Sequence, residues 1–314
     1  MADDHRRMTD GGSHEPLHSE RVTFTSAGTR CLADLYRPPT GDLPWPTVVM
    51  AHVFGANRRW GLGRFADRFA AAGIAAIPFD YRCFGDSDGT PRRLVDPDRQ
   101  LADWAAVLDH VRGLAVVDDT RLAVWGSSFS GGHVLEIARR DPGVQAAIAQ
   151  VPFVDGRATV AHQIADRTHR SRVRMLGRAV ADRLLGVLGG GPVEIPIVTD
   201  PGQGGLIDSP GANHGFSALA EDWDLADNRT PARVVLALPF YRPGTHAADI
   251  EVPVHVTVAE EDRLLPHDPT ERTIAALAAP SVHRVPVAHF DVHRDPWVES
   301  VATEQVTFLR ETLG

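Results

Sequence analysis

The stretch that most constrains the fold of this chain is residues 121–134. It begins with a short apolar, β-prone run, is interrupted by a cluster of small residues around Ser128, and continues at helical spacing through residues 134–138. This pattern predicts a strand, a sharp turn and a helix, with Ser128 at the apex of the turn. Small neighbours are needed because the turn brings the strand and helix backbones close together. The Ser128 hydroxyl is then expected clear of the sheet, near a helix N-terminus.

The turn departs by one residue from the pattern Gly-x-Ser-x-Gly. Ser130 stands at the second glycine position, followed by Gly131 and Gly132. Serine is among the next-smallest residues, so we interpret the stretch as a variant of the motif. The same geometry directs the backbone N–H of Phe129 towards an oxyanion that forms beside Ser128. The alternative is a turn serine that only caps the following helix.

The rest of the chain alternates strand-like and helix-like segments. An antiparallel hairpin is expected first, because two alternating runs flank a short turn. Nearly continuous apolar runs then predict buried parallel strands. The hairpin strands are expected at 21–25 and 31–36, further strands at 47–52, 75–80, 146–151, 252–258 and 282–287, and helices at 61–72, 95–113, 268–279 and 297–312. This order predicts an α/β fold with a doubly wound, mostly parallel sheet, whose sites lie at the carboxyl ends of the strands.

The alternation stops between about residues 157 and 248, and we expect a helical cap there. Residues 160–188 have the periodicity of one or two amphipathic helices, and a segment rich in Pro, Gly and Asp follows. An insertion of this length exceeds an ordinary connection. The expected organisation is therefore a core of residues 19–156 and 249–314 with a cap or lid at 157–248. Residues 1–18 have little to bury and predict a disordered tail.

Composition excludes several classes of function. The net charge is −9 and no basic block is present, which argues against a nucleic-acid partner. Cys31 and Cys83 are too few for a disulfide framework and lack metal-ligand spacing. No glycine pattern for a nucleotide and no His-Glu-x-x-His sequence is present, so we expect neither cofactor nor metal. The sequence contains no apolar run of membrane-spanning length and no secretory signal. We expect a cytoplasmic protein without a membrane partner, and a homodimer stays open.

Three further features follow other predicted strands. Asp262 comes after the strand at 252–258, and His289 comes after the next strand. Phe54 follows the strand at 47–52 and is placed to donate a second backbone N–H. The carboxyl ends of parallel strands share one edge of a sheet, so we expect these groups near Ser128. An acid in such a place orients a histidine and stabilises its imidazolium form.

The order Ser128, Asp262, His289 on alternating βα units resembles the α/β-hydrolase superfamily, from about residue 20 to the end apart from the insertion. Asp-Tyr-Arg-Cys-Phe-Gly-Asp-Ser-Asp-Gly at 80–89 and Gly-Ser-Ser-Phe-Ser-Gly-Gly at 126–132 are similar to dienelactone-hydrolase-like and X-Pro-dipeptidyl-peptidase-like members.

This resemblance implies Ser128 as nucleophile, His289 as general base and then acid, and Asp262 as orienting acid. It also implies an oxyanion hole made by the backbone N–H groups of Phe129 and Phe54.

Several alternatives remain open at this stage. Glu260, Glu261 and Asp155 compete with Asp262 for the role of the acid. We expect His52 to be a structural residue at a strand end. Other members of the family usually have glycine where Val53 stands, and a β-branched residue resists the backbone angles that glycine permits. In the predicted cap, aromatic residues either line an acyl pocket or pack the cap; they are Trp223, Phe240 and Tyr241.

The sequence thus predicts a serine hydrolase that cleaves an ester, thioester or lactone of a small acyl substrate through an acyl-enzyme on Ser128. One alternative is an acyltransferase, or a tailoring lyase or cyclase, that uses the same three residues. A second alternative is a non-catalytic binding protein with the hydrolase fold.

Overall fold

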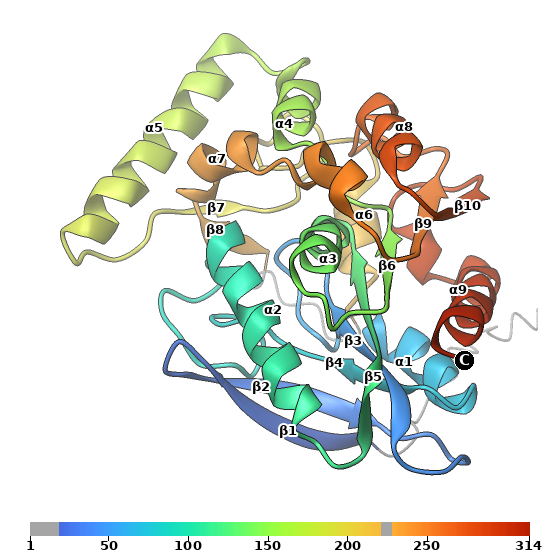
Figure 1. Ribbon diagram of the computed structural model, residues 1–314. Coiled ribbons are helices and arrows are strands. Elements are labelled where there is room, and N and C mark those ends of the chain that lie inside the picture. The colour runs from blue at the N-terminus through green and yellow to red at the C-terminus, as the bar shows by residue number, and fades with distance from the viewer. Residues whose placement is uncertain (1–18, 221–227) are drawn as a thin grey trace, which may run out of the picture.

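The computed structural model describes residues 19–220 and 228–314, and the predicted tail at 1–18 lies outside the described residues. In this part of the chain, eight strands form one sheet in the order β1-β2-β4-β3-β5-β6-β9-β10 (Figure 1). Their bounds are β1 (Ser19–Ser26), β2 (Thr29–Tyr36), β3 (Trp45–Ala51), β4 (Ala75–Pro78), β5 (Val117–Ser127), β6 (Ala146–Gln150), β9 (Val254–Ala259) and β10 (Pro280–Val285).

Strand direction follows the predicted pattern. β1 and β2 form the expected antiparallel hairpin, and β2 pairs antiparallel with β4. The pairs β4–β3, β3–β5, β5–β6, β6–β9 and β9–β10 are all parallel. The prediction of a mostly parallel α/β sheet is therefore confirmed. Because these strands are parallel, the chain leaves each of them at the same edge of the sheet.

Helices cover both faces of the sheet (Figure 1). In β3, Val49 and Ala51 belong to the core cluster that also contains residues of α2, α3 and α8. Val48 and Met50 belong to the cluster formed with α1 and α9. Successive side chains of a strand point to opposite faces, which is why a continuous apolar run is needed here. These helices are α1 (Leu62–Ala71), α2 (Pro97–Arg112), α3 (Phe129–Arg140), α8 (His267–Ala276) and α9 (Trp297–Leu313).

Element boundaries differ from the predictions mainly near α8 and β10. The helix predicted to reach residue 279 ends earlier, with Leu277 already extended at ψ 139°. Pro280 also keeps the helix from reaching residue 279, because a residue that precedes proline is disfavoured in helical conformation. The strand predicted at 282–287 is correspondingly shifted to 280–285.

The segment between β6 and β9 contains the long helix α5 and several short elements, which lie beyond α3 (Figure 1). They are α4 (Gly156–Ile164), α5 (His169–Val187), β7 (Glu194–Pro196), α6 (Ala212–Ser217), β8 (Arg229–Pro231), α7 (Val234–Ala237), and the 3-10 turns η1 (Leu238–Phe240) and η2 (Pro243–Asp249). Two helices thus occupy the region predicted to hold one or two. The small β7–β8 ribbon was not predicted, because strands of three residues carry no readable periodicity. Trp223 lies outside the described residues.

A buried amide joins three strands of the sheet to the last helix. Gln305 of α9 is fully buried, and its Oε1 accepts a hydrogen bond from Trp125 Nε1 at 2.9 Å. Its Nε2 donates to Gln150 Oε1 at 2.8 Å and to Thr257 Oγ1 at 3.2 Å. Polar groups buried in this way are stable only while each has a partner. Among the described residues, every helix is too short or too polar to cross a lipid bilayer.

Replacing this amide tests its contribution to the fold. The substitution Gln305→Leu leaves the buried Trp125 Nε1–H and the side-chain oxygen Oε1 of Gln150 without the partners that Gln305 supplies. Each such loss costs about 1–3 kcal/mol. We expect the free energy of unfolding, measured by urea denaturation, to fall by about 2–5 kcal/mol. The neighbouring exposed variant Glu304→Ala is the control, and an equal loss in both variants would contradict this account.

Candidate active site

Ser128 occupies a strained turn between β5 and α3. Its backbone angles are φ 56° and ψ −112°, which L-residues rarely adopt. Its N–H donates to the Gln150 carbonyl at 2.8 Å, and its own carbonyl accepts from Phe153 N–H at 2.8 Å. A Cβ atom at Gly126 would lie 2.1 Å from the Ser130 carbonyl oxygen, so only glycine fits there. The turn thus holds the Ser128 side chain at the carboxyl edge of the sheet.

His289 lies between Ser128 and Asp262. Its Nε2 is 2.9 Å from Ser128 Oγ, and its Nδ1 is 2.6 Å from Asp262 Oδ2. The three side chains come from the loops after β10, β5 and β9, and the His289 side chain is only 1% exposed. The structure therefore brings together the three side chains to which the sequence analysis assigned a triad.

The Asp262 carboxylate is held by more than its histidine partner. Its Oδ1 accepts hydrogen bonds from the backbone N–H groups of Leu264 at 2.7 Å and Leu265 at 3.1 Å. Burial raises the pKa of Asp262, but His289 and these N–H donors outweigh it and the pKa lies below its usual range. An ionised Asp262 accepts a hydrogen bond from His289 Nδ1–H, which leaves the Nε2 lone pair free to accept one from the Ser128 hydroxyl.

The other acids that were weighed lie elsewhere. Asp155 caps α4 by accepting from Ala158 N–H at 3.0 Å, and it pairs with Arg242 at 2.8 Å. Glu260 and Glu261 are exposed. Of these four acids, Asp262 is the one bonded to His289.

The two amides assigned to an oxyanion hole belong to residues that are in contact. The rings of Phe54 and Phe129 meet edge to face, with centroids 5.2 Å apart. Within residues 19–220 and 228–314, neither backbone N–H donates a hydrogen bond to the protein. The positive φ angles of the loop after β3 fall on Gly55, at 74°, and Gly61, at 75°, and not on Val53. The β-branched residue is therefore accommodated without the backbone strain anticipated from the sequence.

A mostly apolar cavity opens beside Ser128 and His289. The volume of this cavity is about 100 Å³. Its apolar lining includes Phe153, Val160, Ile164, Leu206, Leu238 and Leu264, so most of its wall comes from the segment between β6 and β9. Arg167 also lines it, but this guanidinium is paired with Asp208 at 3.0 Å. Such a cavity fits an apolar acyl group better than a charged one.

Phe240 and Tyr241, the other aromatic residues considered for an acyl pocket, do not line this cavity. Phe240 is 86% exposed, and Tyr241 donates or accepts a hydrogen bond with His133 Nδ1 at 2.6 Å. Tyr241 also packs against Phe129 and stacks on Phe153. It therefore packs behind the cavity wall. Among the described residues, no group of three His, Cys, Asp or Glu side chains is placed to hold a metal ion.

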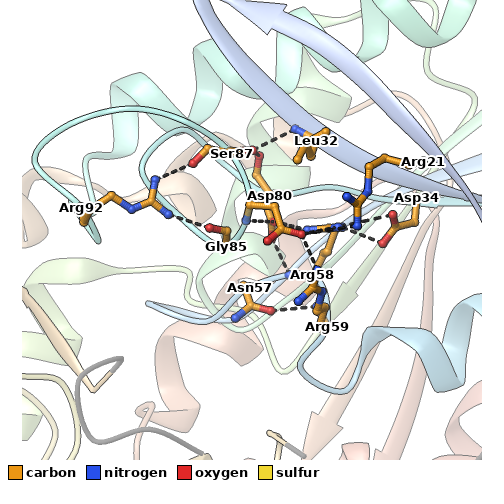
Figure 2. Close-up of polar contacts among 11 residues, drawn as sticks. Arg21, Leu32, Asp34, Asn57, Arg58, Arg59, Asp80, Gly85, Ser87 and Arg92 are labelled. Carbon is orange, nitrogen blue, oxygen red and sulfur yellow. Dashed lines mark hydrogen bonds and ion pairs between the residues drawn. The ribbon is translucent and has the colours of Figure 1, made fainter. Parts of the chain in front are cut away.

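An ion-pair network behind the loop after β3 was missed by the sequence analysis. Figure 2 shows Arg58 among the carboxylates of neighbouring strands and loops. Its Nε donates to Asp34 at 2.6 Å, its Nη2 to Asp86 at 2.9 Å, and its Nη1 to Asp80. The Arg58 backbone N–H also donates to Asp80, at 2.7 Å. The side chains of Arg58 and Asp80 are 1% and 0% exposed, so the network fixes the loop that carries Phe54.

The network keeps the Arg58 guanidinium charged, although burial raises the pKa of the Asp80 carboxyl despite the opposing effect of Arg58. Burial lowers the pKa of the Arg58 guanidinium, but the carboxylates of Asp80 and Asp34 outweigh it and raise that pKa overall. No sequence signal identified Arg58, because its partners lie 22–28 residues away and are ordinary aspartates of strands and loops. Only the folded sheet brings them together.

Comparison with known proteins finds a relative that matches nearly the whole chain. The family model for X-Pro dipeptidyl-peptidase (S15 family) matches residues 27–172. The quorum-quenching protein AidA of Acinetobacter baumannii is 36% identical over 289 residues, which covers 92% of this chain and 93% of AidA. The thiohydrolase aneE of Aspergillus aculeatus is 28% identical over 190 residues, which covers 60% of this chain and 58% of aneE.

A solved structure extends the likeness to the fold. The alpha/beta hydrolase GrgF from Penicillium sp. sh18 superposes with a TM-score of 0.79 at 23% identity, which covers 95% of this chain and 99% of GrgF. The match to the S15 family agrees with the resemblance drawn from residues 80–89 and 126–132.

The Arg58 network gives a prediction with a matched control. Arg58→Gln leaves Asp80 as a buried charge without a cation, and breaking such a pair costs about 3–5 kcal/mol. Arg59→Gln removes a neighbouring arginine that is 60% exposed and pairs with Asp86, and it should cost less than about 1 kcal/mol. Thermal and urea unfolding of both variants measure the difference, and similar losses would contradict the assigned role of the buried pair.

Buried histidines predict loss of stability in acid. Burial lowers the pKa of His52 and His255 to about 4 and that of His133 and His293 to about 3. The unfolded chain binds protons first, near pH 6.5, so stability present above that pH is lost as the pH falls towards the folded values.

We expect His133→Gln to reduce the slope of unfolding free energy against pH by about 1 kcal/mol per pH unit between pH 6 and pH 4.5. Urea titrations at each pH measure it. An unchanged slope in His133→Gln would refute the prediction.

Proposed function

The chain belongs to the α/β-hydrolase superfamily and is an enzyme acting on ester-type bonds, and on this premise we propose that Ser128, His289 and Asp262 are its catalytic triad. The observation that carries this proposal is the continuous hydrogen-bonded chain from Asp262 through His289 to Ser128 at the mouth of the apolar cavity. A histidine whose tautomer is fixed by a carboxylate, within reach of a serine hydroxyl, is the arrangement that activates the hydroxyl as a nucleophile.

The mechanism follows from these contacts. His289 Nε2 takes the hydroxyl proton while Ser128 Oγ attacks the carbonyl carbon of the substrate. The oxygen of the resulting tetrahedral intermediate accepts hydrogen bonds from the Phe129 and Phe54 N–H groups. His289 then gives its proton to the departing alcohol or thiol. Water, deprotonated by the same imidazole, releases the acyl group, while Asp262 stabilises the imidazolium in both halves of the reaction.

The substrate is an ester, thioester or lactone with an apolar acyl part. Apolar side chains surround the space beside Ser128, and Arg167, the one arginine among the described residues of the wall, is already bonded to Asp208 and to the carbonyls of Gly205 and Leu206. We further propose that residues 157–248 act as a cap, because most of the cavity wall belongs to them. This cap then selects the acyl group and shields it from water.

Steady-state kinetics with p-nitrophenyl and thioester substrates of increasing acyl length test the proposal. We expect Ser128→Ala and His289→Ala to lower kcat by at least about 10⁴-fold, because the first removes the nucleophile and the second removes the base that activates it. Asp262→Asn should lower kcat by a similar order, because it favours the wrong histidine tautomer. His283→Ala, a histidine of β10 outside the hydrogen-bonded chain, is the control. Full activity in Ser128→Ala would refute the proposed nucleophile.

An added acyl acceptor separates hydrolysis from transfer. With wild-type enzyme and an alcohol or amine in the assay, product analysis should show the free acid. A product that carries the acceptor in place of water would assign the same triad to acyl transfer.

A further inference from the structure

A chain of buried hydrogen bonds crosses from α2 to the end of β3 behind the nucleophile turn. Trp104 Nε1 lies 2.8 Å from Tyr81 OH, and Tyr81 OH lies 2.7 Å from Ser130 Oγ. Ser130 Oγ in turn lies 2.5 Å from the carbonyl oxygen of His52. Each of these side chains is 0–1% exposed. The proposed mechanism uses none of them directly.

The chemistry of the groups fixes the direction of every bond in this chain. An indole N–H only donates, so Tyr81 OH accepts from Trp104. A carbonyl oxygen only accepts, so the Ser130 hydroxyl donates to His52. The single proton of Tyr81 is then left to donate to Ser130 Oγ. All three hydrogen atoms are therefore committed, and the final donor points at the backbone of the loop after β3.

The last hydrogen bond of this chain, from Ser130 to the His52 carbonyl, lies just beyond the end of the pairing between β3 and β5. The parallel pairing of β3 with β5 ends at Ala51 and Gly126, because β3 itself ends at Ala51. The His52 carbonyl comes one residue after this point, and the Ser130 hydroxyl satisfies it there. Phe54, one of the two proposed oxyanion donors, follows two residues later.

We propose that Ser130 is a positioning residue that sets the separation of the two oxyanion donors. One donor, Phe129 N–H, precedes Ser130 in the same turn, and the other, Phe54 N–H, belongs to the loop that Ser130 holds. The side chain thus ties the two halves of the hole together across the sheet edge. Glycine, usual at this position in the motif, has no hydroxyl with which to make the bond. This inference rests on the proposed function, because it presumes an oxyanion beside Ser128.

The variant Ser130→Ala removes the bond while keeping a small side chain. The loop that carries Phe54 then loses its hydrogen bond to the turn. A Phe54 N–H displaced by a fraction of an ångström stabilises the transition state less well, whereas binding of the substrate in its ground state changes little. We expect kcat to fall by about tenfold with KM within about twofold of wild type. The affinity of a boronic acid that forms a tetrahedral adduct on Ser128 should weaken by about the same factor as kcat/KM falls.

A matched control separates positioning from stability. Thr47 is fully buried near the start of β3, at the opposite end of that strand from the site, and its hydroxyl donates to the Trp45 carbonyl at 3.0 Å. Thr47→Val removes a buried bond from a hydroxyl to a backbone carbonyl, so it should lower the melting temperature but leave kcat and boronic acid affinity unchanged. Tyr81→Phe removes the bond that orients the Ser130 hydroxyl, together with the bond that Tyr81 OH accepts from Trp104 Nε1. A fall in kcat of about two- to threefold at constant KM is expected for it, and this variant decides the matter if Ser130→Ala does not fold.

The outcomes distinguish this inference from the proposed function. If wild type hydrolyses esters and binds the boronic acid, but Ser130→Ala and Tyr81→Phe keep both properties, the positioning role is overturned while the triad stands. If wild type itself neither turns over an ester nor binds the boronic acid, the proposed function fails and this inference fails with it. A loss of kcat in Thr47→Val equal to that in Ser130→Ala would also overturn the positioning role.

Discussion

The backbone conformation of Ser128 is the constraint on which the rest of the structure depends. A serine at φ 56° costs about 1–3 kcal/mol, and that cost is tolerated only where the surroundings determine the conformation. Here the surroundings are the ends of parallel strands: Gln150 of β6 accepts from Ser128 N–H, and Gly126 leaves room for the turn to fold back. The sheet must be parallel and centred on β5 for these contacts to exist.

Several loops at the carboxyl edge of the sheet position the residues of the proposed active site. The loops after β9 and β10 supply Asp262 and His289, which are ordered by backbone donors and by each other. The loop after β3 has two supports of different kinds. On one side Arg58 anchors it through buried carboxylates (Figure 2), and on the other Ser130 bonds the His52 carbonyl. Preorganised donors stabilise developing charge without having to move during the reaction.

Much of this arrangement could be read from the sequence, and the remainder could not for physical reasons. Apolar runs and small residues identified the strands and the turn at Ser128, because burial and close approach leave direct marks on residue type. Asp262 and His289 were selected because each follows a predicted strand. The partners of Arg58 and Ser130 were not predictable, because a hydrogen bond between residues 78 positions apart leaves no local pattern. The cavity wall was likewise hidden, because it depends on how α4, α5 and their connections pack.

The central claim is that Ser128 is an activated nucleophile, and the mass of the intact protein tests it most directly. Wild type would be incubated with a serine-directed fluorophosphonate, beside Ser128→Ala and His289→Ala. The account predicts one adduct on wild type and none on either variant, because the hydroxyl reacts only when His289 accepts its proton. An unlabelled wild type, or an adduct that persists in Ser128→Ala, would contradict it.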